Sequence, residues 1–196
     1  MAEKEDATIK QAFLQNCWDG NKEKVQACLT LEVDVDHIGK AWNEPWTNPS
    51  SSGLAKAAIS GHIEVVDLLL TAPKIDINQT SEYVRTCLHD TCWQPHNLSG
   101  IIVKLCSDPR IKLNERDSLG KTPAFKTVEN GHIENLRALK YVPGVNWNIK
   151  DNEGDSPLML AVKEEKAEKI TELVKIIDID LNATNKSGQT LEQVAR

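Results

Sequence analysis

Long apolar runs are absent from this sequence of 196 residues. No 18 consecutive residues are apolar, so we predict no membrane-spanning helix and no membrane partner. The opening residues, M-A-E-K-E-D-A-T, lack the apolar stretch that an export signal requires. We therefore expect a soluble protein of the cytoplasm, with the nucleus as an alternative location.

Cysteine is scarce, and its five copies form an odd number without the regular spacing of a small disulfide-bonded domain. Because no export signal is present, we expect reduced thiols rather than disulfides. The cysteines are Cys17, Cys28, Cys87, Cys92 and Cys106.

An excess of basic charge is also missing. Lysine and arginine number 23 against 29 aspartates and glutamates, which gives a formal net charge of −6. Nucleic acids and anionic membranes attract proteins through basic surfaces, and no run of Lys or Arg supplies one here. We therefore do not expect nucleic acid as a partner.

What the sequence does contain is a repeat. Gly-His followed by Ile-Glu occurs at Gly61-His62 and again at Gly131-His132. An asparagine closes a hydrophobic stretch at intervals of about 34 residues. Those asparagines are Asn78, Asn114, Asn148 and Asn182, and a third marker reads G-K-T-P at 120–123, G-D-S-P at 154–157 and G-Q-T-L at 188–191. Three markers with one period indicate a stacked array of similar units.

Each repeat is predicted to be a pair of short helices. Thr122 and Ser156 suit N-caps, and Pro123 and Pro157 suit the first helical turn, where a missing N–H costs nothing. The best copy is 52–78, in which Gly61 separates a short helix from an apolar one at 63–70. Glutamates in the first turn of the second helix complement its dipole; they are Glu64, Glu134 and Glu168.

These markers resemble the ankyrin repeat, whose pattern is roughly G-x-T-P-L-H-x-A-A-x-x-G-H-x-E-V-V-x-L-L-L. The resemblance implies an all-α solenoid of helix pairs with projecting finger loops, forming a single domain over 1–196. The repeats are expected at residues 7–36 (a terminal cap), 37–76, 77–112, 113–146, 147–180 and, incompletely, 181–196. The third has Pro95-His96 where Gly-His belongs, and the fifth has Glu165-Lys166 there. The ending within a sixth repeat favours a fragment of a longer chain.

Proteins of this family generally bind protein partners through finger tips and the exposed, concave side of the first helices. Carried over to this sequence, that side begins with Trp18, Ile59 and Trp93, an apolar stripe typical of a binding surface. The alternative is that these side chains pack on adjoining repeats. A long loop between Asp36 and Ser52 adds two tryptophans with the same two interpretations. The candidate partner-binding residues are Trp18, Trp42, Trp46, Ile59, Ser60, Trp93, Gln94, Arg116, Glu129 and Lys150.

Charged residues dominate the later fingers, including Arg116, Asp117, Lys150 and Asp151. Charges of both signs at loop tips could set the register of a partner. The alternative is a solvated face without a binding role.

Cys87, His89, Cys92 and His96 offer four ligands, two thiols and two imidazoles, of the types that zinc accepts. However, Cys87 and His89 lie two residues apart and would point to different sides of a helix. His89 and Cys92 also fall on structural positions of the repeat, so we predict no metal. Lys121 follows a glycine, but the earlier glycine of a phosphate loop is replaced by Glu115. We find no catalytic constellation and predict no cofactor and no enzyme activity.

The sequence therefore predicts a non-enzymatic module, such as a scaffold, that binds a protein or peptide. The alternative is a regulatory or assembly domain of a larger enzyme, channel or signalling protein, cut near residue 196. Finger asparagines of this family can be hydroxylated, often with leucine eight residues earlier. Asn78, which follows Leu70 at that distance, is the predicted modification site.

Overall fold

The computed structural model describes residues 2–39, 51–81 and 83–195, with side chains from residue 7 onward. Trp42 and Trp46 lie outside the described residues. Contacts between residues divide the chain into two compact units, Met1–Cys87 and Leu88–Arg196, which are called unit 1 and unit 2 below. All named elements in the described part are helices, so the predicted all-α class is confirmed.

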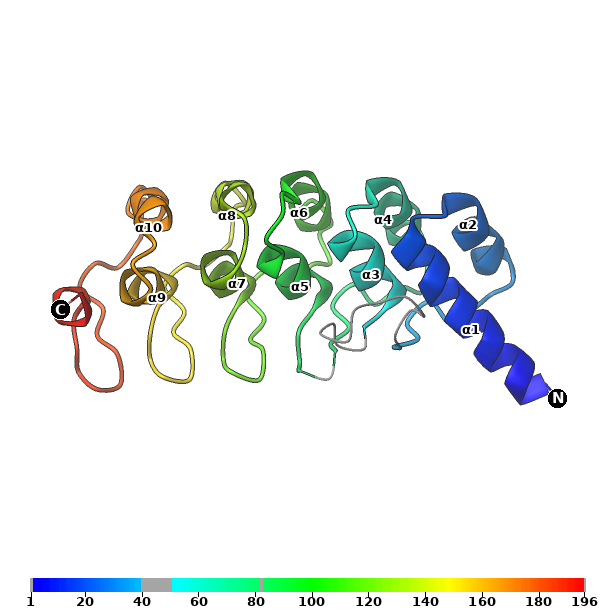
Figure 1. Ribbon diagram of the computed structural model, residues 1–196, viewed down its shortest axis with the longest axis horizontal. Coiled ribbons are helices and arrows are strands. Elements are labelled where there is room, and N and C mark those ends of the chain that lie inside the picture. The colour runs from blue at the N-terminus through cyan, green and yellow to red at the C-terminus, as the bar shows by residue number, and fades with distance from the viewer. Residues whose placement is uncertain (1, 40–50, 82, 196) are drawn as a thin grey trace. The chain divides into compact units, whose positions relative to one another are not determined.

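Unit 1 contains two helix pairs in two layers (Figure 1). The first layer holds α1 (Ala2–Asp19) and α3 (Gly53–Ile59), which contact each other. The second layer holds α2 (Lys22–Thr30) and α4 (Ile63–Leu70). Each helix also contacts its pair mate, as a stack of helical hairpins requires. The core includes Phe13, Leu14, Cys17, Val25, Leu54, Val65, Val66 and Leu69.

Unit 2, taken by itself, also has two layers of helices (Figure 1). One layer holds α5 (Cys87–Trp93), α7 (Pro123–Glu129) and α9 (Pro157–Lys163). The other layer holds α6 (Ser99–Cys106), α8 (Ile133–Lys140) and α10 (Ala167–Leu173). A short final helix, α11 (Leu191–Val194), contacts α9. The core includes Leu88, Ile102, Leu105, Phe125, Leu136, Leu139, Leu158, Met159 and Leu173.

The helices begin at the predicted residues for local chemical reasons. The Ser156 hydroxyl accepts a hydrogen bond from the backbone N–H of Met159 at 3.3 Å, and Pro157 occupies the first turn. Thr122 also occupies an N-cap position before Pro123, but its side chain makes no capping hydrogen bond. The three predicted glutamates lie in the first turns of α4, α8 and α10.

The fifth repeat replaces Gly-His by residues that perform the same tasks. In unit 1, His62 Nε2 donates to the carbonyl oxygen of Trp18 at 2.9 Å, which satisfies the end of α1. In unit 2, Lys166 Nζ donates to the carbonyl oxygen of Val128 at 2.8 Å, near the end of α7. Glu165 has φ +53, the left-handed conformation that Gly61 has at φ +86. The fold therefore survives the loss of this marker.

The irregular turn of the third repeat depends on one buried side chain from the fourth. Asn135 in α8 is 0% exposed. Its Nδ2 donates to the carbonyl oxygens of Gln94 at 3.2 Å and His96 at 3.0 Å. Its Oδ1 accepts from the backbone N–H of Leu98 at 2.7 Å. These three hydrogen bonds hold the turn that lacks Gly-His.

Candidate functional site

The three fingers of unit 2 share one turn, built around a buried polar residue. Asp117 Oδ1 accepts from the backbone N–H groups of Leu119 and Lys121, both at 2.9 Å. Asp151 makes the equivalent pair with Glu153 at 2.9 Å and Asp155 at 3.1 Å. Asn185 does the same with Ser187 and Gln189, both at 3.0 Å. Asp117 and Asp151 are buried within their own turns, so neither interpretation of the finger charges, partner register or solvated face, describes these two residues.

Adjacent fingers are hydrogen-bonded to each other through their backbones. The N–H of Asn152 donates to the carbonyl oxygen of Leu119 at 3.0 Å, and the N–H of Lys186 to that of Glu153 at 3.1 Å. This approach requires glycine, because a Cβ on Gly154 would lie 2.6 Å from the nitrogen of Lys186. Residues 116–121, 150–155 and 184–189 thus form a continuous structure, here called the finger edge.

A pocket of about 490 Å³ opens on the finger edge. It is lined by Arg116, Lys150, Asp151, Asn152, Gly154, Thr184, Asn185 and Lys186, and is called the finger pocket below. Arg116 Nε donates to the carbonyl oxygen of Gly120 at 3.1 Å, and Lys150 Nζ to that of Thr184 at 2.7 Å. The structure therefore brings the predicted residues Arg116 and Lys150 together. Lys186 was missed, because only the spatial alignment of fingers places it beside them.

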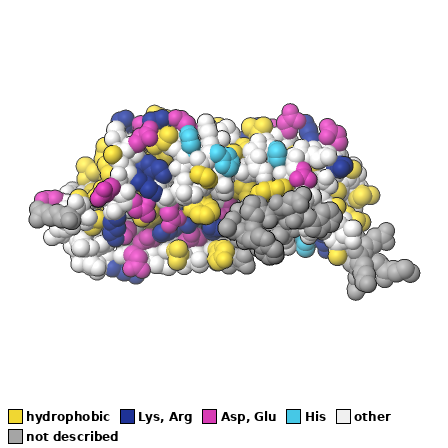
Figure 2. Space-filling view, in the orientation of Figure 1, with side chains coloured by type: hydrophobic (Ala, Val, Ile, Leu, Met, Phe, Trp, Pro, Cys, Tyr) yellow, Lys and Arg dark blue, Asp and Glu magenta, His cyan; other side chains and the backbone are white. Residues whose placement is uncertain are grey.

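A charged band covers α7, α9 and the adjoining finger bases, where acidic and basic side chains gather in Figure 2. Lys126 is buried, and its Nζ lies 2.8 Å from Asp117 and 3.0 Å from Glu129. Burial alone would raise the pKa of Glu129, but hydrogen bonds from Lys121 and Lys126 outweigh it and lower that pKa. The predicted contact residue Glu129 is therefore already neutralised by partners in its own chain. The band consists of Asp117, Lys121, Lys126, Glu129, Asp155 and Lys163.

The predicted apolar stripe is divided between the two units. In unit 1, Trp18 and Ser60 are half-buried, whereas Ile59 is only 7% exposed. The prediction that Ile59 is exposed is wrong, because every residue of α3 is buried. In unit 2, Trp93 and Gln94 are half-buried. Their carbonyl oxygens accept from Asn130 Nδ2 at 3.2 Å and from the backbone N–H of His132 at 3.0 Å.

The Cys87–His96 stretch is part of the core of its repeat. Cys87, His89 and Cys92 are buried, whereas His96 is exposed. His89 Nε2 donates to the carbonyl oxygen of Lys121 at 3.1 Å, and burial lowers the pKa of this histidine to about 4. Among the residues with described positions, no group of three or more His, Cys, Asp or Glu side chains could hold a metal ion.

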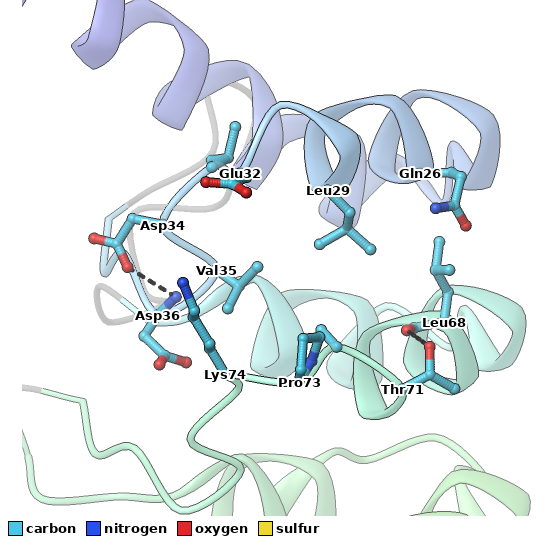
Figure 3. Close-up of a pocket in the computed structure, with 12 residues that line it drawn as sticks. Gln26, Leu29, Glu32, Asp34, Val35, Asp36, Leu68, Thr71, Pro73 and Lys74 are labelled. Atoms are coloured by element: carbon cyan, nitrogen blue, oxygen red, sulfur yellow. Dashed lines mark hydrogen bonds between the residues drawn. The ribbon is translucent and has the colours of Figure 1, made fainter.

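A second pocket, of about 660 Å³, lies in unit 1 between α2 and α4 (Figure 3). Leu29, Val35 and Leu68 give it an apolar wall, while Asp34 and Asp36 lie at one end. Lys74 points toward these carboxylates in Figure 3. This pocket could not be predicted from the sequence, because ordinary helix-packing residues form its apolar wall.

The finger asparagines connect neighbouring repeats. Asn114 Nδ2 donates to the carbonyl oxygen of Gly144 at 2.8 Å, and Asn148 Nδ2 to that of Asp178 at 2.6 Å. Their Oδ1 atoms accept the backbone N–H groups of Asn146 and Asp180, both at 2.8 Å. Asn78 is half-buried, and its modification stays a prediction.

No helix within the described ranges is both long and apolar enough to cross a membrane. A comparison with protein families finds a match to ankyrin repeats, three copies, over residues 88–185. The search of curated proteins finds no match. Ankyrin repeats are generally protein–protein interaction modules and are typically non-catalytic. Since the match spans half of the chain and the helix pairs stack as that fold requires, the chain belongs to the ankyrin-repeat family.

Proposed function

We propose that this chain is a non-enzymatic module that binds a protein or peptide partner on the finger edge of unit 2. The proposal depends on the backbone hydrogen bonds between adjacent fingers. The N–H of Asn152 donates to the carbonyl oxygen of Leu119, and the N–H of Lys186 donates to that of Glu153. Loops that are already ordered lose little conformational entropy when a partner binds. The finger edge is therefore suited to binding without rearrangement.

Leu119 gives the finger edge an apolar contact. It stands at the tip of the first finger of unit 2 and is 55% exposed, although it is a large hydrophobic residue. Burying such a side chain against a partner contributes favourably to binding. Trp93 and Gln94, half-buried at the end of α5, are further candidate contact residues. Family membership alone names no partner, so the location must be tested directly.

Photo-crosslinking tests this location. A benzophenone amino acid replaces Leu119 in one variant and Ile177 in a control variant. Ile177 is 98% exposed and follows α10 in the other layer, so it controls for exposure and apolar character. We expect light-dependent partner adducts from position 119 and few from position 177.

Adducts found only from position 177 would contradict the proposal, since they would place the partner on the opposite layer. The partner identified from position 119 is then purified and its affinity measured. Leu119→Asp should weaken that affinity, while Ile177→Asp should leave it unchanged. Equal affinities for both variants and the parent protein would also exclude the finger edge.

A further inference from the structure

We infer that the finger pocket receives carboxylate side chains from an acidic segment of the partner. This inference rests on the proposed function and adds the chemical class of the ligand. Three cations from successive fingers, Arg116, Lys150 and Lys186, line one pocket. An extended peptide that crosses these fingers would meet them in turn.

Within the described part of the chain, these cations differ from their neighbours in having no carboxylate partner. In the charged band, Lys126 lies 2.8 Å from Asp117, and Lys121 and Lys163 pair with Glu129 and Asp155. Among the described residues, none of the three pocket cations forms an ion pair. Unit 2 thus neutralises the lysines of the charged band and leaves positive charge in the pocket.

Arg116 and Lys150 line the pocket, and each keeps N–H donors that no other described residue engages. An ammonium group has three N–H donors, and one from Lys150 is engaged by the carbonyl oxygen of Thr184 at 2.7 Å. Arg116 uses Nε for Gly120 at 3.1 Å and Nη2 for Asn152 Oδ1 at 3.4 Å, a long contact. Charged donors of this kind make the stronger hydrogen bonds to carboxylates.

The pocket is lined by a single acidic residue, Asp151, whose charge offsets only one of the three cations. Asp151 is buried, and its Oδ1 accepts two backbone N–H groups of its own turn, from Glu153 and Asp155. Its carboxylate is therefore occupied in forming the finger. The remaining lining residues are neutral, and the amides of Asn152 and Asn185 are already hydrogen-bonded to Ser118 and Gln189.

The surroundings favour a peptide carboxylate over a nucleic acid. The chain has a formal net charge of −6, which repels a long phosphate backbone more than a short acidic segment, because more of the longer polyanion lies beyond the pocket. The cations lie on separate fingers, an arrangement that suits single carboxylates on a peptide.

The test uses the full chain and an oligo-glutamate peptide as the probe. Isotope-labelled protein is titrated to about 1 mM peptide, where weak binding is visible by NMR. We expect shifts of the amide signals of Lys150, Asn152 and Lys186. Lys150→Glu and Lys186→Glu should each weaken binding by roughly tenfold, and added salt should weaken it in the parent protein.

Lys24→Glu is the matched control. Lys24 is exposed in α2 of unit 1, so its reversal makes the same change in net charge away from the pocket. An equal loss of affinity in this variant would show a general charge effect and overturn the inference. So would an absence of shifts with oligo-glutamate, or tighter binding of a phosphopeptide or single-stranded DNA of matched length.

Two further measurements separate this inference from the proposed function. Melting curves show whether each reversal leaves the protein folded, and Lys150→Gln repeats the test without introducing a negative charge. Crosslinking from position 119 is then repeated in the Lys150→Glu background. Retained partner adducts together with unchanged peptide affinity would exclude the acidic ligand while the finger edge stands as a binding surface.

Discussion

Val84 adopts a backbone conformation that its own side chain disfavours. Its φ is +58, and it stands at the turn position that Gly120 occupies with φ +76 in the next finger. The two turns close in the same way. The Ser81 N–H donates to the Arg85 carbonyl oxygen at 2.8 Å, and the Asp117 N–H to that of Lys121 at 2.9 Å. The finger of the third repeat therefore keeps the same turn, although its left-handed position is held by a β-branched residue under backbone strain.

Val84→Gly should make the protein more stable. The left-handed conformation costs a residue with a Cβ about 1–2 kcal/mol, and the greater entropy of glycine in the unfolded chain offsets part of that gain. We expect a net increase of about 1 kcal/mol in the free energy of unfolding by urea. Val84→Ala is the control, since it shortens the side chain but keeps the Cβ. If both variants gained the same stability, the cause would be removal of the exposed methyl groups of valine and not relief of backbone strain.

His89 should make stability depend on pH. Burial lowers its pKa in the folded protein to about 4, from 6.5 in the unfolded chain. Between these values the unfolded chain binds more protons, so stability is lost as pH falls through this window. His89→Gln keeps an N–H donor for the carbonyl oxygen of Lys121 but cannot titrate. Its free energy of unfolding should fall less than that of the parent between about pH 6.5 and pH 4. Parallel curves would argue against a buried neutral imidazole.

At the scale of elements, polar side chains connect one repeat to the next. Asn135 of α8 holds the irregular turn after α5 through three hydrogen bonds. Because the Asn135 side chain is fully buried, its own polar atoms could not turn to water if they lost these bonds. The asparagine therefore connects the third and fourth repeats.

Asn135→Asp should destabilise the protein by about 2–3 kcal/mol. The substitution keeps the acceptor for the N–H of Leu98 but removes both donors and buries a charge. Asn130→Asp is the matched control, since Asn130 is exposed and makes one bond, 3.2 Å to the Trp93 carbonyl oxygen. Urea denaturation should show a loss below about 1 kcal/mol for the control. Similar losses in both variants would contradict the role assigned to Asn135.

Ion pairs connect α8 to α10 in the second layer. Glu172 lies 2.6 Å from Lys140, 3.3 Å from Lys175 and 3.4 Å from Arg137. The hydrogen bond from Lys140, followed by that from Lys175, lowers the pKa of Glu172 to about 2. A carboxylate with a lowered pKa stabilises the folded state above its unfolded value of 4.5. That stability is lost as the pH falls toward 2.

Glu172→Gln should therefore be destabilising near neutral pH and nearly harmless in acid. We expect the difference in melting temperature between parent and variant to narrow from about pH 5 to pH 2. Glu168→Gln serves as a control, because Glu168 is exposed and makes a single ion pair with Arg137 at 3.2 Å. A difference that stays constant with pH would show that Glu172 acts through packing and not charge.

Local signals made the helix pairs predictable, while contacts between repeats were not. Ser156 and Pro157 act within their own helix, so their spacing alone predicts where α9 begins. Asn135 and Lys166 act on the preceding repeat with chemistry that the repeat pattern does not contain. Arg116 and Lys150 were candidates as charged finger residues. Their shared pocket was not predictable, because it depends on the backbone hydrogen bonds that hold adjacent fingers together.

At the scale of the whole molecule, contacts are made between neighbouring helix pairs. In unit 2, α6 contacts α8, and α8 contacts α10 in the same layer. Each unit buries its own apolar residues, Phe13 and Leu14 in unit 1 and Phe125 and Leu136 in unit 2. Arrays of this kind have stabilities that approximate a sum of repeat and interface contributions. A local defect should therefore have a local effect.

Hydrogen exchange on the full chain with Asn135→Asp tests this distribution of stability. The lost bonds join the turn at 94–98 to α8, so amides of α6 and α8 should exchange faster than in the parent protein. Amides of α1 should change little, because none of these bonds involves unit 1. Val84→Gly should have the opposite effect. Amides of the finger that contains Val84 should exchange more slowly than in the parent protein. Equal acceleration of exchange in α1 and α8 would show that the chain opens as one cooperative unit, against the additive behaviour expected of a repeat array.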